Sequence, residues 1–241
     1  MKLEGRSALI TGASRGLGLA IARSLAGQGA SIACVARPGS ELDAAVASLR
    51  GVGAPAVAAP ADVTQADQVG AAVRTAVDAF GRLDIVVLNA GTWMGGSVTD
   101  MPEATWDSLL DLNLKHAYLT LHHALPHLVR QGAGTIVGIA SLGAFVGQAD
   151  APAYAASKWG LRGLLESAAL ELKPHRVRVS LVHPHNMNSA GRAIAPDSPE
   201  RDGTLETAEV ASLVAWICAA PQHVAVGEVT VWPLAAGVRS F

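Results

Sequence analysis

Tyr154 and Lys158 are the two residues of this sequence whose types and spacing best fit acid–base chemistry. They stand four residues apart in the stretch AYAASKWG, and on a helix that spacing places both side chains on one face. A phenol ordinarily titrates near ~10, and a neighbouring positive charge favours its ionised form. A downward pKa shift of about two units corresponds to about 2.7 kcal/mol and brings a phenol toward the range of efficient general acid catalysis. We therefore interpret the pair as a proton donor and acceptor, with Lys158 lowering the pKa of Tyr154.

A glycine-rich turn, TGASRGLG at 11–18, follows a short apolar run and opens a stretch of helical period. Glycines let the backbone approach a pyrophosphate closely, and the helix N-terminus attracts its negative charge. The spacing is G-x-x-x-G-x-G, and a lone glycine turn also occurs without any ligand, but the strand–turn–helix context favours dinucleotide binding. The residues expected to contact the cofactor here are Gly12, Ser14, Arg15, Gly16, Leu17 and Gly18.

Two arginines favour NADP(H) over NAD(H). The second strand is expected to end near Ala36, where dinucleotide folds usually carry an Asp or Glu that binds the ribose hydroxyls. This chain has Arg37 there and Arg15 in the glycine turn. Guanidinium groups bind a 2′-phosphate well, and we expect no acid nearby to repel it. The alternative is that Arg37 is an ordinary solvated charge at a strand end.

The elements that must position these residues alternate along the chain. Short β-branched runs at 7–11, 31–36, 56–59, 83–88, 134–140, 177–183 and 228–231 predict strands, and stretches of helical period at about 16–28, 40–51, 65–80, 102–130, 153–173 and 207–219 predict helices. This alternation predicts an α/β fold with a parallel sheet covered by helices on both faces. We expect one domain over 1–241 and one long irregular segment at about 185–206, which is either a substrate loop or a surface connection.

Composition narrows the classes of function. The chain has 241 residues, half of them hydrophobic, which suffices for one large core. A net charge of -2 gives no electrostatic basis for binding nucleic acid or an anionic membrane. No run reaches the ~18 apolar residues of a membrane span, and the amino terminus does not fit a signal peptide. Cys34 and Cys218 lie in separate apolar stretches, so we expect buried thiols in the cytoplasm and no metal site.

Six motifs together resemble the compact, single-domain short-chain dehydrogenases/reductases, in particular the carbonyl-reducing members that include 3-oxoacyl-carrier-protein reductases. They occur in the family's order along nearly the whole chain: TGASRGLG, Asp62-Val63, Asn89-Ala90-Gly91, Asn113, Ser141 and Tyr154-x-x-x-Lys158. The resemblance implies a three-layer, doubly wound Rossmann-type fold with a seven-stranded parallel sheet. It also implies hydride transfer between the nicotinamide of NADP(H) and a carbonyl or secondary alcohol.

The resemblance gives each catalytic residue a role. Ser141, thirteen positions before Tyr154, would hydrogen-bond the substrate carbonyl while Tyr154 donates the proton. Lys158 would also hold the nicotinamide ribose. Asn113 stands in a helical stretch, where Asn is unfavourable, and would order a water that relays protons to Lys158. Two donors aimed at a developing alkoxide stabilise the transition state more than the ground state.

The remaining cofactor contacts also follow from the resemblance. Asp62 would bind the adenine amino group, with Val63 contributing its backbone. The turn after the fourth strand would support that strand and line the cofactor groove. Including the nicotinamide end, the additional residues implied are Asp62, Val63, Asn89, Ala90, Gly91, Pro184, Met187 and Ser189, alongside Arg37, Tyr154 and Lys158.

One segment departs from the family pattern. The family usually has Pro-Gly after the sixth strand, whereas this chain has Pro184 followed by His185. A side chain there would crowd the nicotinamide or require a different backbone torsion, because glycine alone tolerates positive φ freely. Alternatively, the loop accepts His185 at negative φ, and its imidazole is solvated or faces the substrate. The carboxyl end, VTVWPLAAGVRSF, also lacks the family's Asp-Gly-Gly turn, which predicts an altered subunit contact.

The substrate is less closely defined. Trp93, Met94, Met187 and the segment 142–146 offer apolar walls, which favours a small or medium apolar carbonyl compound. The loop charges balance, so no basic patch for an acidic carrier protein is expected; they are Arg192, Asp197, Glu200, Arg201 and Asp202. By resemblance, the two long helices pair between subunits in a homodimer or D2 homotetramer. Two other functions stay open: a non-redox isomerase or lyase on the same scaffold, and a dinucleotide-binding sensor or scaffold protein without hydride transfer.

Overall fold

Seven parallel strands form one sheet within the residues that this computed structural model describes, which are 2–189, 194–195 and 198–236. The strands are β1 (Ser7–Thr11), β2 (Ser31–Ala36), β3 (Ala56–Pro60), β4 (Ile85–Leu88), β5 (Gly134–Ile139), β6 (Val177–Pro184) and β9 (Glu228–Val231). Their order in the sheet is β3-β2-β1-β4-β5-β6-β9. The predicted doubly wound, seven-stranded Rossmann-type fold is confirmed, and each strand begins and ends within two residues of its predicted position.

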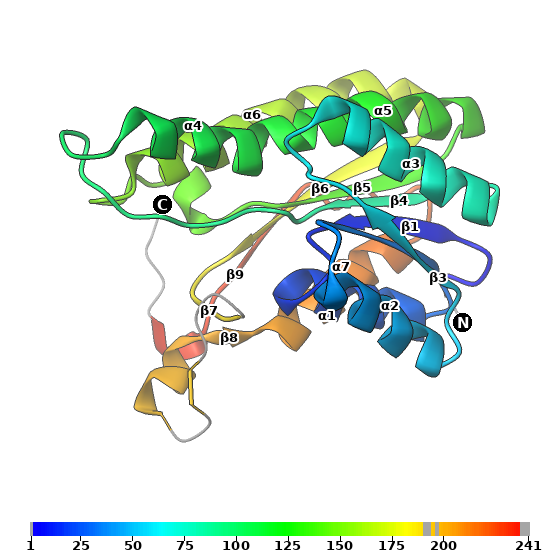
Figure 1. Ribbon diagram of the computed structural model, residues 1–241, viewed down its shortest axis with the longest axis horizontal. Coiled ribbons are helices and arrows are strands. Elements are labelled where there is room, and N and C mark those ends of the chain that lie inside the picture. The colour runs from blue at the N-terminus through cyan, green and yellow to red at the C-terminus, as the bar shows by residue number, and fades with distance from the viewer. Residues whose placement is uncertain (1, 190–193, 196–197, 237–241) are drawn as a thin grey trace.

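Helices cover both faces of the sheet (Figure 1). One layer holds α1 (Gly16–Gly27), α2 (Ser40–Gly51) and α7 (Thr207–Ala219), and the other holds α3 (Ala66–Phe80), α4 (Glu103–Leu110), α5 (His116–Gln131) and α6 (Pro152–Leu172). Successive strand residues point to opposite faces. Accordingly Leu9 joins the core under α3, α5 and α6, while Ile10 joins the core under α1 and α7. Burial on both faces explains why the strands are continuous apolar runs.

The stretch predicted as one helix at 102–130 is interrupted. Between α4 and α5 lies a π-helical turn, Asp111–Lys115, which contains Asn113. A π turn is an insertion into the regular helical ladder, so an apolar periodicity of helical type does not reveal it. The prediction of a regular helix at this position was therefore wrong, and the irregular turn coincides with a predicted site residue.

The segment predicted to be irregular at 185–206 contains regular structure. β7 (Met187–Asn188) pairs in parallel with β8 (Leu205–Glu206), and a 3₁₀ turn spans Pro199–Gly203. The pairing is held by an Asn188 amide that donates to the Glu206 carboxylate at 3.2 Å, and Arg201 forms an ion pair with Glu206 at 2.7 Å. The predicted loop charges at Arg192 and Asp197 lie outside the described residues.

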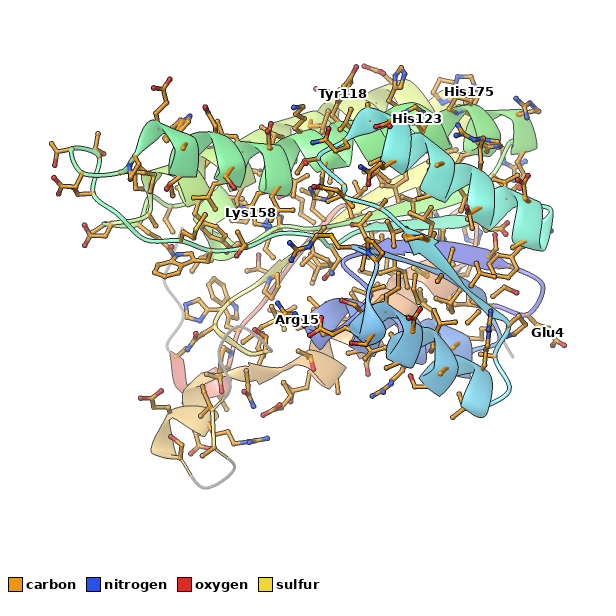
Figure 2. The ribbon with its side chains drawn as sticks, viewed as in Figure 1. Glu4, Arg15, Tyr118, His123, Lys158 and His175 are labelled. Atoms are coloured by element: carbon orange, nitrogen blue, oxygen red, sulfur yellow. The ribbon has the colours of Figure 1, made fainter. Side chains whose placement is uncertain are left out.

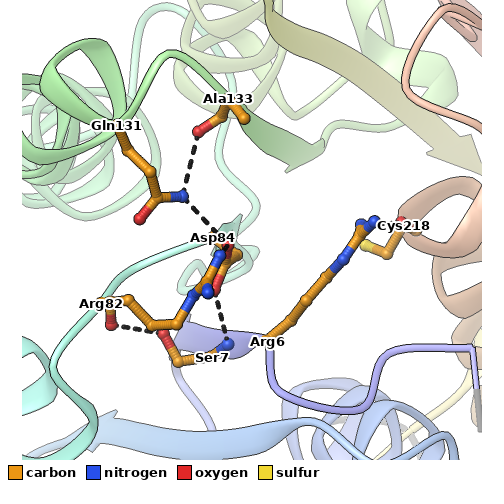
Figure 3. Close-up of polar contacts among 7 residues, drawn as sticks. All are labelled: Arg6, Ser7, Arg82, Asp84, Gln131, Ala133 and Cys218. Atoms are coloured by element: carbon orange, nitrogen blue, oxygen red, sulfur yellow. Dashed lines mark hydrogen bonds and ion pairs between the residues drawn. The ribbon is translucent and has the colours of Figure 1, made fainter.

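Asp84 joins β1, β4 and α5 at the amino-terminal edge of the sheet (Figure 3). Its carboxylate accepts hydrogen bonds from the Ser7 backbone N–H at 2.9 Å, from Arg82 at 2.7 and 2.6 Å, and from the Gln131 amide at 3.0 Å. A buried carboxylate with this many donors is well satisfied. The cluster therefore has a structural role, at the opposite end of the strands from the glycine turn.

Candidate active site

A groove of about 1810 Å³ opens at the carboxyl ends of the strands. The order β3-β2-β1-β4-β5 reverses direction between β1 and β4, and in such sheets ligands bind at this switch point. The predicted site residues on the groove walls are Gly12, Ser14, Arg15, Gly16, Leu17, Gly18, Arg37, Asp62, Val63, Asn89, Ala90, Gly91, Ser141, Tyr154, Lys158, Met187 and Ser189. Asn113 and Pro184 are not part of the lining. Arg15 and Lys158 come from opposite sides of the sheet (Figure 2).

The glycine turn between β1 and α1 is held by Asn89. The Asn89 amide donates to the carbonyl of Thr11 at 2.9 Å and to that of Gly12 at 3.3 Å. Gly12 has φ +68°, and a Cβ on Gly18 would stand 2.1 Å from the Gly12 oxygen and 2.6 Å from the Asn89 nitrogen. The turn thus requires glycine at both positions, and Asn89 acts on the groove mainly by fixing this backbone.

Thr11 was not among the predicted site residues, although it begins the glycine motif. Its Oγ1 accepts hydrogen bonds from the backbone N–H of Asn89 at 2.9 Å and of Ala90 at 3.0 Å. These bonds join the end of β1 to the turn after β4. A hydroxyl residue at the end of an otherwise apolar strand was the sequence signal that could have identified it.

The end of the groove beside Arg15 and Arg37 carries an acid that the sequence analysis did not place there. Glu41, in the first turn of α2, lies on the groove wall, and its carboxylate is 3.5 Å from Arg15 Nη1. The expectation that no acid stands near the two arginines is therefore wrong. Both side chains are exposed, at 65% and 62%, so solvent weakens the ion pair. The turn after β2 brings α2 back beside the glycine turn, which the linear sequence does not show.

Asp62 follows β3 and forms a local turn with Thr64. Its Oδ1 accepts hydrogen bonds from the Thr64 N–H at 3.0 Å and from the Thr64 hydroxyl at 2.7 Å. These two bonds, with a smaller contribution from the charge of Arg37, lower the pKa of Asp62 against the opposing effect of burial. The group on this wall is therefore a carboxylate at neutral pH.

Ser141 caps the 3₁₀ turn Leu142–Ala144. Its Oγ accepts a hydrogen bond from the Gly143 N–H at 3.1 Å. A hydroxyl that accepts one bond still has its own hydrogen to donate. Burial raises the pKa of Tyr154, and a hydrogen bond with Ser141 lowers it in part. The serine and the phenol therefore meet on one wall of the groove.

The predicted lowering of the Tyr154 pKa by Lys158 is not found. Burial dominates at both residues: it raises the pKa of Tyr154 and lowers the pKa of Lys158 to about 8. Lys158 Nζ lies 5.7 Å from the centre of the phenol ring and donates to the Ile139 carbonyl at 3.0 Å. Burying the Tyr154 phenolate or the Lys158 ammonium costs more free energy than the attraction between the two charges returns at this separation. Tyr154 is consequently a protonated phenol at neutral pH.

Asn113 is fully buried and bonded on both sides of its amide. Its Oδ1 accepts from the Thr92 N–H at 2.8 Å, and its Nδ2 donates to the Thr92 carbonyl at 2.9 Å and to Ser157 Oγ at 3.1 Å. Ser157 in turn donates to the Tyr154 carbonyl at 2.7 Å. The side chain thus tethers the loop after β4 to α6. The ordering of a water by Asn113 stays a prediction.

Ser157 and Thr92 were missed from the sequence. A small hydroxyl residue at 157, three positions after Tyr154 on α6, was the available signal. The tether also explains the glycine at 91, because a Cβ there would stand 3.0 Å from Asn113 Oδ1 and 3.8 Å from Lys158 Nζ.

His185 lies on the groove wall without requiring a glycine-like backbone. Among the described residues other than glycine, positive φ occurs at Asp150 and Arg176, and not at His185. The His185 N–H donates to the Val231 carbonyl at 2.8 Å, and the imidazole centre lies 6.1 Å from the Trp232 ring. The sequence left open whether the loop accepts His185 at negative φ, and in the structure it does.

The part of the chain that the structure describes also bears on metal binding and on membrane insertion. Within it, no group of three or more His, Cys, Asp and Glu side chains is placed to hold a metal ion. No described helix has the length and apolar character needed to cross a membrane. Cys34 and Cys218 are buried free thiols, as the sequence predicts.

The fold is of the Rossmann type, and comparisons with known proteins give the family. The model of the short chain dehydrogenase family matches residues 6–197. The chain is 36% identical over 232 residues to a (-)-trans-carveol dehydrogenase of Rhodococcus erythropolis, covering 88% of this chain and 83% of the relative. It is 37% identical over 180 residues to a 3-oxoacyl-[acyl-carrier-protein] reductase of Staphylococcus aureus, covering 74% and 73%.

A solved structure agrees with these relatives. The crystal structure of a metagenomic short-chain oxidoreductase in complex with NADP has a TM-score of 0.85 and 38% sequence identity, covering 97% of this chain and 99% of that one. The chain therefore belongs to the short-chain dehydrogenase/reductase family and is an oxidoreductase.

Proposed function

We propose that this enzyme uses NADP(H) to interconvert a carbonyl compound and a secondary alcohol, with Tyr154 as the general acid and base. The observation that carries the proposal is the placement of Ser141, Tyr154 and Lys158 on the wall of one groove with the glycine turn. An acid–base set beside a dinucleotide cradle is the arrangement that hydride transfer to a carbonyl requires.

The groove residues fit a dinucleotide. Gly12 and Gly18 line the groove beside the amino end of α1, where backbone N–H groups and the helix dipole favour a pyrophosphate. Arg15 and Arg37 line the groove, and guanidinium groups bind a 2′-phosphate well, which supports NADP(H); the related metagenomic oxidoreductase was solved in complex with NADP. When bound, the cofactor supplies or accepts the hydride.

The protein residues handle the substrate oxygen and its proton. The Ser141 hydroxyl donates a hydrogen bond to the carbonyl oxygen, and the phenol of Tyr154 transfers its proton to that oxygen as negative charge develops there. The raised pKa of Tyr154 keeps this proton in place at neutral pH. Lys158, charged below about pH 8, stabilises the phenolate that remains. In alcohol oxidation the same proton moves in the opposite direction.

An apolar substrate of small or medium size is supported by three of the predicted wall residues. Trp93, Leu142 and Met187 line the groove, and the Trp93 side chain is 60% exposed there. Met94 is not part of the lining. Covering an exposed apolar surface of this kind with an apolar substrate is favourable, because it removes both surfaces from water.

We also propose a homodimer or D2 homotetramer in the cytoplasm. Tyr118 on α5 and Trp159 and Leu170 on α6 expose 51%, 48% and 78% of their surface, and Figure 2 shows Tyr118 pointing away from the sheet. Large exposed apolar side chains on two neighbouring helices suit a subunit contact. Light scattering of the purified protein measures the assembly.

Tyr154→Phe tests the catalytic proposal, because the chain has two tyrosines and the other provides a matched control. Binding of NADPH is measured by fluorescence titration, and turnover by NADPH oxidation across a panel of ketones. We expect Tyr154→Phe to bind NADPH normally and to lose turnover, while Tyr118→Phe retains both. Cofactor binding without turnover on any carbonyl would indicate a sensor or scaffold protein instead. Product formation without NADPH consumption would indicate an isomerase or lyase.

A further inference from the structure

We infer that His183, a residue without a role in the proposed mechanism, positions Ser141 for catalysis; the inference rests on the proposed function of Ser141. His183 lies near the end of β6 with no exposed surface. Its Nδ1 is 3.1 Å from the backbone carbonyl oxygen of Ser141. A carbonyl oxygen only accepts hydrogen bonds, so Nδ1 carries the hydrogen and donates it. This bond fixes the tautomer and the orientation of the imidazole.

The imidazole contacts the Ser141 turn at its far end as well. Phe145 follows the 3₁₀ turn that Ser141 caps, and its ring centre lies 4.5 Å from that of His183 at an interplanar angle of 52°. One buried side chain therefore holds both the residue that begins the turn and the residue that follows it. The turn between them also contains Gly143, whose N–H donates to Ser141 Oγ.

Two charged residues lie behind His183, although its Nε2 makes no hydrogen bond to either of them. Glu228 Oε1 on β9 lies 3.9 Å from His183 Nε2, and it accepts a hydrogen bond from Arg162 Nε at 2.8 Å. The Arg162 guanidinium also lies 4.5 Å from the centre of the Phe145 ring. Arg162 is on α6, four residues after Lys158. The cluster thus connects the Ser141 turn with the helix that carries Tyr154.

This arrangement acts on the geometry of the reacting groups and not on cofactor binding. The cluster lies outside the described lining of the groove, which contains none of its four members: His183, Phe145, Arg162 and Glu228. Without the Nδ1–H donor, the Ser141 carbonyl keeps, among the described residues, only the hydrogen bond from the Ala144 N–H at 3.0 Å, which lies within the turn itself, so the turn as a whole can shift. A misplacement of about 1 Å at a catalytic group lowers a rate by about 100-fold.

Two substitutions separate the hydrogen bond from the packing of the ring. His183→Phe keeps an aromatic ring against Phe145 and loses the donor, whereas His183→Asn places an amide N–H near the position of Nδ1. We expect kcat to fall about 10-fold or more in His183→Phe and to return to within about 3-fold of wild type in His183→Asn. The Kd for NADPH stays within about 2-fold in both. His123→Phe, at a histidine of α5 packed against Gly70, is the matched control and keeps wild-type kcat.

Three results overturn the inference: wild-type kcat in His183→Phe, equal impairment in His183→Phe and His183→Asn, or a loss of NADPH affinity that parallels kcat. Nitrogen NMR of the wild-type enzyme gives an answer even if the variants do not fold. An Nδ1–H tautomer at His183 supports the inference, and an Nε2–H tautomer overturns it. Ser141→Ala, measured in parallel, separates the two proposals, because full activity there contradicts the role of Ser141 itself.

Discussion

Gly143 packs against the ring of Tyr154, and a Cβ at this position would stand 3.2 Å from Cε1 and 3.5 Å from Cδ1 of the phenol. The same residue donates its N–H to Ser141 Oγ. One glycine therefore contacts both groups that we propose to act on the substrate oxygen.

Gly143→Ala should displace the phenol by a few tenths of an ångström and lower kcat about 3- to 10-fold, because a misplacement of about 1 Å costs about 100-fold. NADPH affinity should not change, since the methyl group meets the phenol and not the glycine turn. Gly147→Ala is the control, because a Cβ there meets no atom within 4 Å. Steady-state kinetics of both variants make the comparison, and equal kcat values would contradict the proposed contact.

Ser157→Ala should lower both stability and activity. Ser157 Oγ is fully buried between the Asn113 amide and the Tyr154 carbonyl, so its removal leaves a buried donor unsatisfied at a cost of about 1–3 kcal/mol. Urea unfolding and kcat are the measurements. Ser212→Ala removes an exposed hydroxyl of α7 that bonds within its own helix, and it should leave both unchanged. A Ser157→Ala enzyme with wild-type stability would show that the tether is dispensable.

Lys158→Met should change the pH dependence of stability. The free energy of unfolding of the variant minus that of wild type should be larger at neutral pH than at high pH. Burial lowers the pKa of Lys158 from 10.5 to about 8, so between these values the unfolded chain binds more protons than the folded chain. Wild-type stability therefore rises with pH across this window, by up to about 3 kcal/mol. The variant lacks this contribution, and other titrations cancel in the difference. Unfolding both proteins at about pH 7 and about pH 10 tests the sign; a difference independent of pH contradicts it.

Glu41→Gln should tighten NADPH binding several-fold. It removes the carboxylate that lies 3.5 Å from Arg15 and would repel a 2′-phosphate. Arg37→Asp should have the opposite effect, weakening NADPH and improving NADH, because an acid at that strand end binds ribose hydroxyls. Fluorescence titrations with both cofactors at fixed salt measure the change. If wild type bound NADH as tightly as NADPH, the interpretation of both arginines would be wrong.

The sequence by itself determined the sheet, most of the helices and the family. Strand ends are local properties: β-branched runs bounded by turn residues locate β1, β2 and β9 at their predicted bounds. The motif residues could be named for the same reason, since Tyr154 and Lys158, or the glycines of the first turn, lie close together in the chain.

Only the tertiary structure decided which effects dominate inside the groove. Burial, which depends on packing from every side, reversed the expected direction of the Tyr154 pKa. The pairing of Glu41 with Arg15 joins residues 26 positions apart, and that of His183 with Ser141 joins residues 42 positions apart. Neither pairing has a periodic or local signature in the sequence. Local patterns therefore named the groups that we propose to react, while long-range packing set their charge and held them in position.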